Sequence, residues 1–221
     1  GTTPAISSSF AFSGSDTIDV ASAVHDPDQN RVIIASGLTG TANGKCYTID
    51  CSGATPTGAT SEFQASSVYN PNITYDTAND KVVMSYYDNA NSGYQSYIAG
   101  TVDGSSNTIT FGTKTTTSTA QNQYPQYNTM RFDTANSQSV NFWTGNNTSP
   151  DNYGSYITNA TLSGTTVVLG DLETVHAPAG SANAWFYNAM VYDPDTNKMV
   201  IAYSDYGNSY YPYGNVVTPG F

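Results

Sequence analysis

A turn sequence that begins with aspartate recurs four times and constrains the fold more than any other feature of this chain. Each copy runs from an Asp to a Lys, Arg or Gln five residues later, and the copies span residues 26–31, 76–81, 133–138 and 193–198. Successive copies are 50, 57 and 60 residues apart, and the interval from the last copy through the C-terminus to the first is 54 residues. Because this interval matches the internal ones, we expect a closed ring of repeats; an open stack would need atypical capping repeats.

Length and composition agree with one domain, residues 1–221, with repeats that start near residues 20, 69, 126 and 186. A repeat of about 55 residues is too short to bury a core of its own, so the repeats must support one another. Only 10% of the residues are charged, and the chain contains 18 Tyr and 19 Gly. This composition favours pleated strands with turn-rich connections over long helices.

The second repeat shows the expected strands most clearly. Short β-prone segments separated by turn residues predict four antiparallel strands, at residues 72–76, 81–88, 94–102 and 108–112. In the other repeats the matching second strands are 31–35, 140–143 and 199–203, and the third repeat adds a third strand at 156–162 and a fourth at 167–170. Four antiparallel strands per repeat form one blade of a β-propeller.

The last repeat is shorter than the others. After its strand at 213–217 the chain ends without a fourth strand, whereas residues 5–12 form a strand-like segment before the first repeat. The predicted fold class is therefore all-β: a four-bladed β-propeller, closed by the N-terminal strand, which completes the last blade and removes an open edge.

The segment from Tyr75 to Gly112 carries a resemblance to a known family. Tyr-Asp, then Lys-Val-Val, Tyr-x-Asp, Gly-Thr-Val-x-Gly and Thr-Phe-Gly follow one another there, a pattern that resembles the propeller repeats of bacterial and phage surface and tail-fibre proteins. The third repeat departs from it at Phe132 and Gln138, and the first at His25 and Arg31. The resemblance implies an exposed propeller used in adhesion or recognition and supplies no catalytic residue.

Charge restricts the partners. The formal net charge is −11 with six basic residues, so the surface repels nucleic acid and anionic lipid. No segment is apolar enough to span a membrane, and the N-terminus lacks signal-peptide features. We expect an extracellular, cell-surface or virion-surface protein. N-glycosylation sequons begin at Asn72, Asn146, Asn147 and Asn159, but chance explains several of them in a chain so rich in Asn, Ser and Thr.

The two cysteines, Cys46 and Cys51, are expected to be small buried side chains. In a straight strand a separation of five residues places the sulfurs on opposite faces, beyond disulfide reach; a local disulfide through a bulge is the alternative. Neither Cys-x-x-Cys spacing nor a nearby His supports zinc. Oxygen donors such as Asp88 and Asp205 lack the spacing of a calcium loop, so no metal or cofactor is expected.

Antiparallel connectivity sorts the loops onto two faces. The Asp-initiated turns lie on one face, where their Asp and Asn residues serve as turn formers. The other face gathers longer loops rich in Tyr, Trp, Asn and Asp, which stack on and hydrogen-bond to sugars. The candidate ligand-binding residues are Asn70, Asp88, Tyr94, Tyr127, Asn128, Asp151, Tyr153, Trp185, Tyr187, Asn188, Asp205 and Tyr211. The alternative is that Tyr is simply common here and that the polar residues cap loops.

The predicted function is non-enzymatic recognition of a glycan or cell-surface polysaccharide, as in a lectin. A sialidase needs an arginine cluster, but the only arginines, Arg31 and Arg131, are predicted on the opposite face. A propeller glycosidase needs paired carboxylates, and the candidates Asp19, Asp88, Asp151 and Asp205 suit turns. His25 is interpreted as a packing residue, and His176 lies in a connecting loop. A further alternative is a structural subunit of a surface fibre or sheath that self-assembles by exchanging its N-terminal strand.

Overall fold

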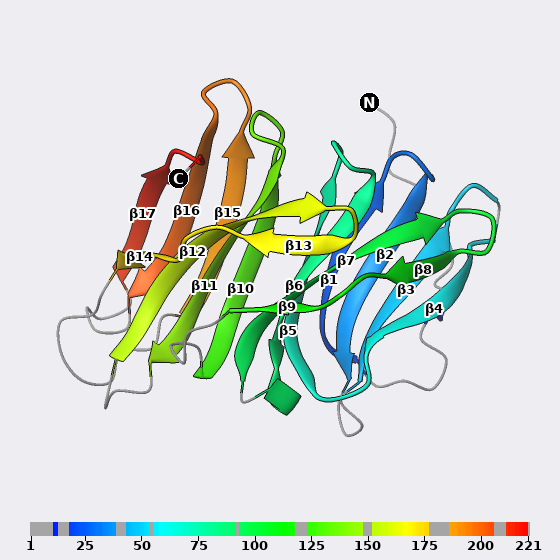
Figure 1. Ribbon diagram of the computed structural model, residues 1–221, viewed down its shortest axis with the longest axis horizontal. Helices are drawn as coiled ribbons and strands as arrows, with labels where there is room; N and C mark the ends of the chain where they lie inside the picture. The colour runs from blue at the N-terminus through cyan, green and yellow to red at the C-terminus, as the bar shows by residue number, and fades with distance from the viewer. Residues whose placement is uncertain are drawn as a thin grey trace, which may run out of the picture.

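The computed structural model describes residues 11–12, 18–38, 43–53, 55–91, 93–117, 123–147, 152–176, 186–205 and 211–220. These residues form four antiparallel sheets, numbered first to fourth in chain order (Figure 1). Within them, the only helical element is the 3₁₀ turn η1 (Asn89–Asn91). The prediction of an all-β fold is confirmed.

Each sheet is built from strands that follow one another in sequence. The first sheet contains β1 (Ile18–Asp26), β2 (Arg31–Leu38), β3 (Gly44–Asp50) and β4 (Thr57–Gln64). The second contains β5 (Val68–Asp76), β6 (Lys81–Asp88), β7 (Tyr94–Asp103), β8 (Thr108–Phe111) and the short β9 (Thr115–Thr116). The third contains β10 (Gln123–Asp133), β11 (Gln138–Asn147), β12 (Asn152–Ser163), β13 (Thr166–Leu169) and β14 (Glu173–His176), and the fourth β15 (Phe186–Asp193), β16 (Lys198–Asp205) and β17 (Tyr211–Val217).

The repeated aspartate closes the same hairpin in every sheet, along the upper edge of Figure 1. In the second sheet, Asp76 Oδ1 accepts the backbone N–H groups of Ala78 (2.9 Å) and Asn79 (3.1 Å). The residue that ends each turn has a positive φ; the four are Asn30 (51°), Asp80 (54°), Ser137 (51°) and Asn197 (52°). Asn and Asp tolerate this left-handed conformation better than other side chains, which explains why the turn sequence recurs.

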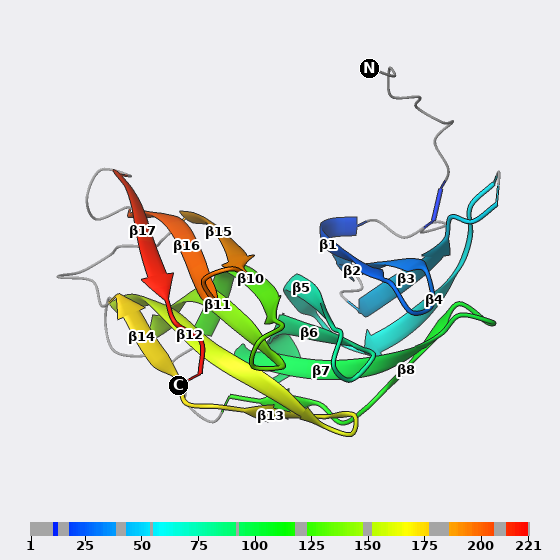
Figure 2. The ribbon, with the colours of Figure 1, turned by 90° about the horizontal axis from the view of Figure 1, so that it is seen from above.

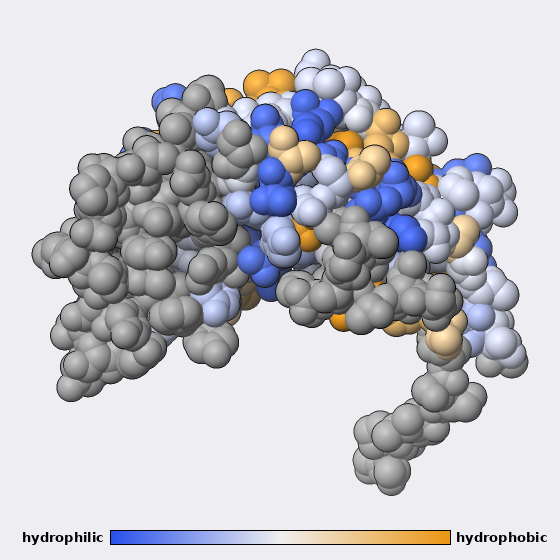
Figure 3. All heavy atoms as spheres, turned by 90° about the horizontal axis from the view of Figure 1, so that it is seen from below, coloured by the Kyte–Doolittle hydropathy of each residue, from blue (hydrophilic) through white to orange (hydrophobic). Residues whose placement is uncertain are grey.

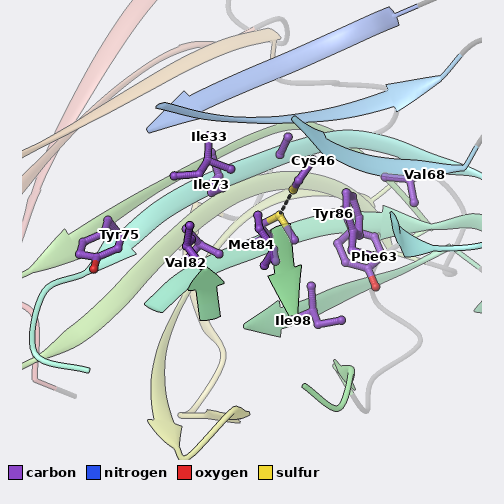
Figure 4. Packing of buried hydrophobic residues seen from close by; sticks show 13 residues of the cluster. Ile33, Cys46, Phe63, Val68, Ile73, Tyr75, Val82, Met84, Tyr86 and Ile98 are labelled. Atoms are coloured by element: carbon purple, nitrogen blue, oxygen red, sulfur yellow. Dashed lines mark hydrogen bonds between the residues drawn. The ribbon is translucent and has the colours of Figure 1, made fainter. Parts of the chain in front are cut away.

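The core lies between the faces of successive sheets. Between the first and second sheets, Ile33 and Cys46 pack on Val82 and Met84, and the Cys46 Sγ–H group donates to Met84 Sδ at 3.3 Å (Figure 4). The next interface joins Val83 and Tyr97 to Met130 and Ala160, and the last joins Val140 and Phe142 to Met199 and Ile201. The second and third sheets thus each bury one face against the sheet before them and the other against the sheet after them.

The sheets form an open arc (Figure 2). Among the described residues, no strand of the first sheet pairs with a strand of the fourth, so the predicted closed ring of four blades is not confirmed. Residues 5–10 of the predicted closing strand lie outside the described residues. Its last residue, Phe12, lies on the first sheet, with its ring 5.2 Å from that of Tyr47, and the predicted pairing of this segment with the last repeat stays a prediction.

The cysteines and the sequons separate into buried and exposed positions. Cys46 is fully buried, whereas Cys51 is exposed and both are free; the interpretation of two buried thiols is right for Cys46 and wrong for Cys51. The amide of Asn72 donates to Asn128 O at 3.0 Å and that of Asn159 to Gln138 Oε1 at 2.7 Å, so two sequons are engaged in the fold. The side chains of the other two, Asn146 and Asn147, lie outside the described part of the chain.

Candidate functional site

The structure places ten of the twelve candidate residues at the strand ends opposite the Asp hairpins, the end that Figure 3 views from below. Asp151 and Trp185 lie outside the described residues, as do the side chains of Tyr153, Tyr187, Asp205 and Tyr211. The candidates with described side chains are Asn70, Asp88, Tyr94, Tyr127, Asn128 and Asn188.

The candidate asparagines connect neighbouring sheets. The Asn128 amide donates to Ser85 Oγ at 2.8 Å, to Ser85 O at 3.2 Å and to Asn70 O at 3.3 Å. The Asn188 amide makes the corresponding contact one sheet further on, to Tyr127 O at 2.9 Å. Asn70 has a φ of 48° at the bulge in β5 and presents its carbonyl to Asn128. The amides of Asn128 and Asn188 therefore satisfy buried backbone groups, which explains them without a ligand.

Asp88 is also held inside the protein. Its side chain is fully buried, and its two oxygens form an ion pair with Lys114 and accept a hydrogen bond from Gln64 Nε2 at 3.2 Å. Burial, together with the negative charge of Asp88, raises the pKa of the neighbouring Tyr86 hydroxyl. Because its partners neutralise and occupy the carboxylate, Asp88 serves the fold rather than a ligand.

An exposed aromatic ring lies at the same end of the second sheet. The Tyr69 side chain is 46% exposed, and its ring lies 5.4 Å from that of the buried Tyr87 in an edge-to-face arrangement. The polar turn η1 follows directly on β6 and presents Asn89 to solvent, while Tyr94 opens β7 and is half-buried. We call this group, Tyr69, Tyr87, Asn89, Asn91 and Tyr94, the open end of the second sheet.

Sequence reasoning did not select Tyr69, Gln64 or Lys114 as site residues. Lys114 is distant from Asp88 in sequence, and no local pattern signals the pair; Tyr69 precedes Asn70 and could have been found as an aromatic residue beside a turn. The fully buried Gln95 lies beside Tyr87 across β6 and β7, and its carboxamide makes no hydrogen bond to protein.

At the Asp-hairpin end, the described arginine side chains are engaged by groups of the protein itself. The Arg31 guanidinium is occupied by Gly104 O at 2.6 Å and by Asp50 at 3.0 Å, and Arg131 donates to its neighbour's carbonyl. His25 is exposed and lies 3.3 Å from Asn30 Oδ1. Across the described residues, no group of three or more His, Cys, Asp or Glu side chains could hold a metal ion, and no helix is long and apolar enough to cross a membrane.

Comparisons with known proteins show a distant similarity to a solved structure. No protein-family model and no curated protein matches the chain. Among solved structures, the chain is similar to an exo-β-1,3-galactanase from Phanerochaete chrysosporium, solved with β-1,3-galactotriose, at 10% identity and a TM-score of 0.47. The match covers 86% of this chain and 42% of the galactanase chain, so the chain spans less than half the length of that enzyme. A similarity of this extent assigns neither a substrate nor a site residue.

Proposed function

We propose that this chain is a non-enzymatic recognition module of the β-propeller type, which binds carbohydrate at the open end of the second sheet. The observation that carries the proposal is the exposed Tyr69 ring, which Tyr87 holds edge-on at 5.4 Å. An aromatic ring fixed by a second ring loses little conformational entropy when a ligand stacks on it. The apolar face of a pyranose ring is such a ligand.

Polar groups beside the ring match the hydroxyl groups of a sugar. The Asn89 side chain is exposed next to Tyr87, and the Asn91 amide lies 3.4 Å from Thr116 Oγ1. Carboxamides both donate and accept hydrogen bonds, as neighbouring sugar hydroxyls require.

Electrostatics favour a neutral saccharide over an acidic one. Lys114, the cation next to this end, is already paired with the buried Asp88, and the chain carries a formal net charge of −11. An anionic sugar would meet a repulsive field, because the cation described beside this end is already paired. We therefore favour neutral glycans of a cell surface, reached by an extracellular or virion-borne protein.

Asp88 is also unsuited to glycosidase chemistry. A general acid or nucleophile must reach the scissile bond, but the Asp88 carboxylate is fully buried and bound by Lys114 and Gln64. Recognition without hydrolysis therefore fits the described side chains better than catalysis does.

A glycan array probed with the purified chain, followed by affinity measurements on the best neutral glycan, tests the proposal. Tyr69→Ala should weaken binding about tenfold or more, as expected for loss of an aromatic anchor, with unchanged thermal unfolding because the ring is half exposed. Lys81→Ala, at the opposite end of the same sheet, is the control and should bind as the original chain does. No retained glycan, or equal losses from both variants, would contradict the proposal and favour a structural subunit.

A further inference from the structure

The interface between successive sheets repeats. Among the described residues, no further sheet packs on the outer face of the fourth sheet. In each of the first three sheets, the second residue after the hairpin is buried by the next sheet: Ile33, Val83 and Val140 are 0%, 1% and 0% exposed. The same position in the fourth sheet is Val200, which is 39% exposed. Val191 and Val216, its cross-strand neighbours, are 58% and 68% exposed. We call this surface the end face of the fourth sheet.

The first sheet carries the complementary half. The residues one and three positions after the hairpin face the preceding sheet. In the second, third and fourth sheets they are fully buried: Val82 and Met84, Ser139 and Asn141, and Met199 and Ile201. In the first sheet they are Val32 and Ile34, which are only half-buried, and the cross-strand neighbour of Ile34, Ala23, is exposed. This surface is the end face of the first sheet. Figure 2 shows both end faces turned toward the opening of the arc.

In the described residues, the fourth sheet has fewer strands than the other three. The first three sheets carry β4, β8 or β13 beyond their third strand, whereas the described fourth sheet ends at β17. Tyr47 lies opposite Ile34 on the end face of the first sheet, and Phe12 covers it. On the other face of the same sheet, β3 and β4 contact β8, the outer strand of the second sheet. Phe12 therefore lies where the outer strand of a sheet docked on this face would lie.

A polar contact at the hairpins joins the first two sheets. Tyr75 of the second sheet donates its hydroxyl to Asp28 Oδ2 of the first, at 2.5 Å. The residue in the place of Tyr75 in the first sheet is His25, and the residue in the place of Asp28 in the fourth is Asp195; both are exposed. When the two end faces meet, the ring N–H of His25 can donate a hydrogen bond to the Asp195 carboxylate.

We propose that a second copy of this chain covers the end faces, with the fourth sheet of each copy packed on the first sheet of the other. The two end faces form a heterologous interface, in which two different surfaces meet. Copies joined through such an interface form a closed ring when the rotation from one copy to the next leads back to the first copy. Two open arcs of four sheets joined in this way make a two-fold symmetric ring of eight sheets, within the range of four to eight blades known for propellers. This inference does not depend on the proposed carbohydrate function.

Sedimentation velocity of the full chain over a hundredfold concentration range tests the proposal, with Ala23→Glu and Val200→Glu each placing a charge on one end face. We expect the unsubstituted chain to form dimers, and each variant to weaken dimerisation by at least about tenfold, since a buried unpaired carboxylate costs more than that factor. Val168→Glu is the matched control, because Val168 is 48% exposed on β13 of the third sheet and lies on neither end face. It should dimerise normally.

Mixing the two variants gives the decisive result. A mixture keeps one undamaged interface, formed by the first sheet of Val200→Glu and the fourth sheet of Ala23→Glu, so heterodimers should form although neither variant dimerises alone. A chain that stays monomeric at every concentration, dimers that survive both substitutions, or variants that do not complement each other would each overturn the proposal. If Val200→Glu lowers the unfolding temperature, Val216→Glu replaces it, because that side chain is more exposed.

Discussion

Replacing Asn128 by alanine separates its role in the fold from a role in ligand binding. The side-chain amide makes its shortest hydrogen bond to Ser85 Oγ, at 2.8 Å, and longer ones to Ser85 O and Asn70 O, at 3.2 and 3.3 Å. All three acceptors belong to the second sheet, so the substitution removes a connection between two sheets. It also leaves backbone carbonyls without this donor.

The expected cost follows from those distances. A protein hydrogen bond contributes about 1 kcal/mol net, and a buried polar group left without a partner costs about 1–3 kcal/mol. With one short and two long bonds lost, we expect Asn128→Ala to lower the free energy of unfolding by about 2 kcal/mol. For a chain of this size that corresponds to a fall of about 4–8 °C in the unfolding temperature.

Differential scanning calorimetry with a parallel glycan-binding assay measures both effects. Asn188→Ala, which removes a single hydrogen bond of 2.9 Å to Tyr127 O, should cost about half as much. Both variants should keep their glycan affinity at temperatures where they are folded. An unchanged unfolding temperature together with lost binding would show that Asn128 is a ligand contact, and would refute its assignment as a connection between sheets.

Further predictions concern buried and titrating side chains. Lys114→Met should destabilise the protein by about 3 kcal/mol in denaturant unfolding, because it leaves the buried Asp88 carboxylate without its cation; stability equal to that of the parent chain would contradict this role of Lys114. A thiol reagent should modify one cysteine of the folded chain and two after denaturation, because Cys51 is exposed whereas burial of Cys46 removes access and raises its thiol pKa; two reactive thiols in the folded chain would refute this. Burial of Asp133 opposes ionisation, but hydrogen bonds from its neighbours hold its pKa below the usual value. The resulting stability is present above the unfolded pKa of about 3.9 and is lost as pH falls through the folded pKa, so Asp133→Asn should flatten the acid limb of the stability profile, and an unaltered limb would argue against it.

The strands were predictable because their boundaries are set locally. The Asp-initiated turn fixes where each hairpin begins, and the predicted strand 81–88 coincides with β6. The preceding strand was predicted too short: β5 starts at Val68 instead of residue 72, since a bulge between Tyr69 and Asn72 lets the strand continue through Pro71.

The roles of the polar residues were not predictable from local sequence. Asn128 is a turn-like or ligand-like residue by composition, but its partners lie 43 and 58 residues away in the neighbouring repeat. Asp88 likewise pairs with Lys114, 26 residues on. The equal spacing of the repeats favoured a closed ring but does not fix the angle between sheets, which depends on how the side chains of each interface pack.

Backbone hydrogen exchange in the presence of a bound neutral glycan tests the central claim most directly. We predict that the glycan slows exchange at the open end of the second sheet, in residues 67–70 and 88–94, and leaves the four Asp hairpins unchanged. Slowed exchange confined to the hairpins, or evenly distributed over all four sheets, would contradict a binding site at the open end of the second sheet.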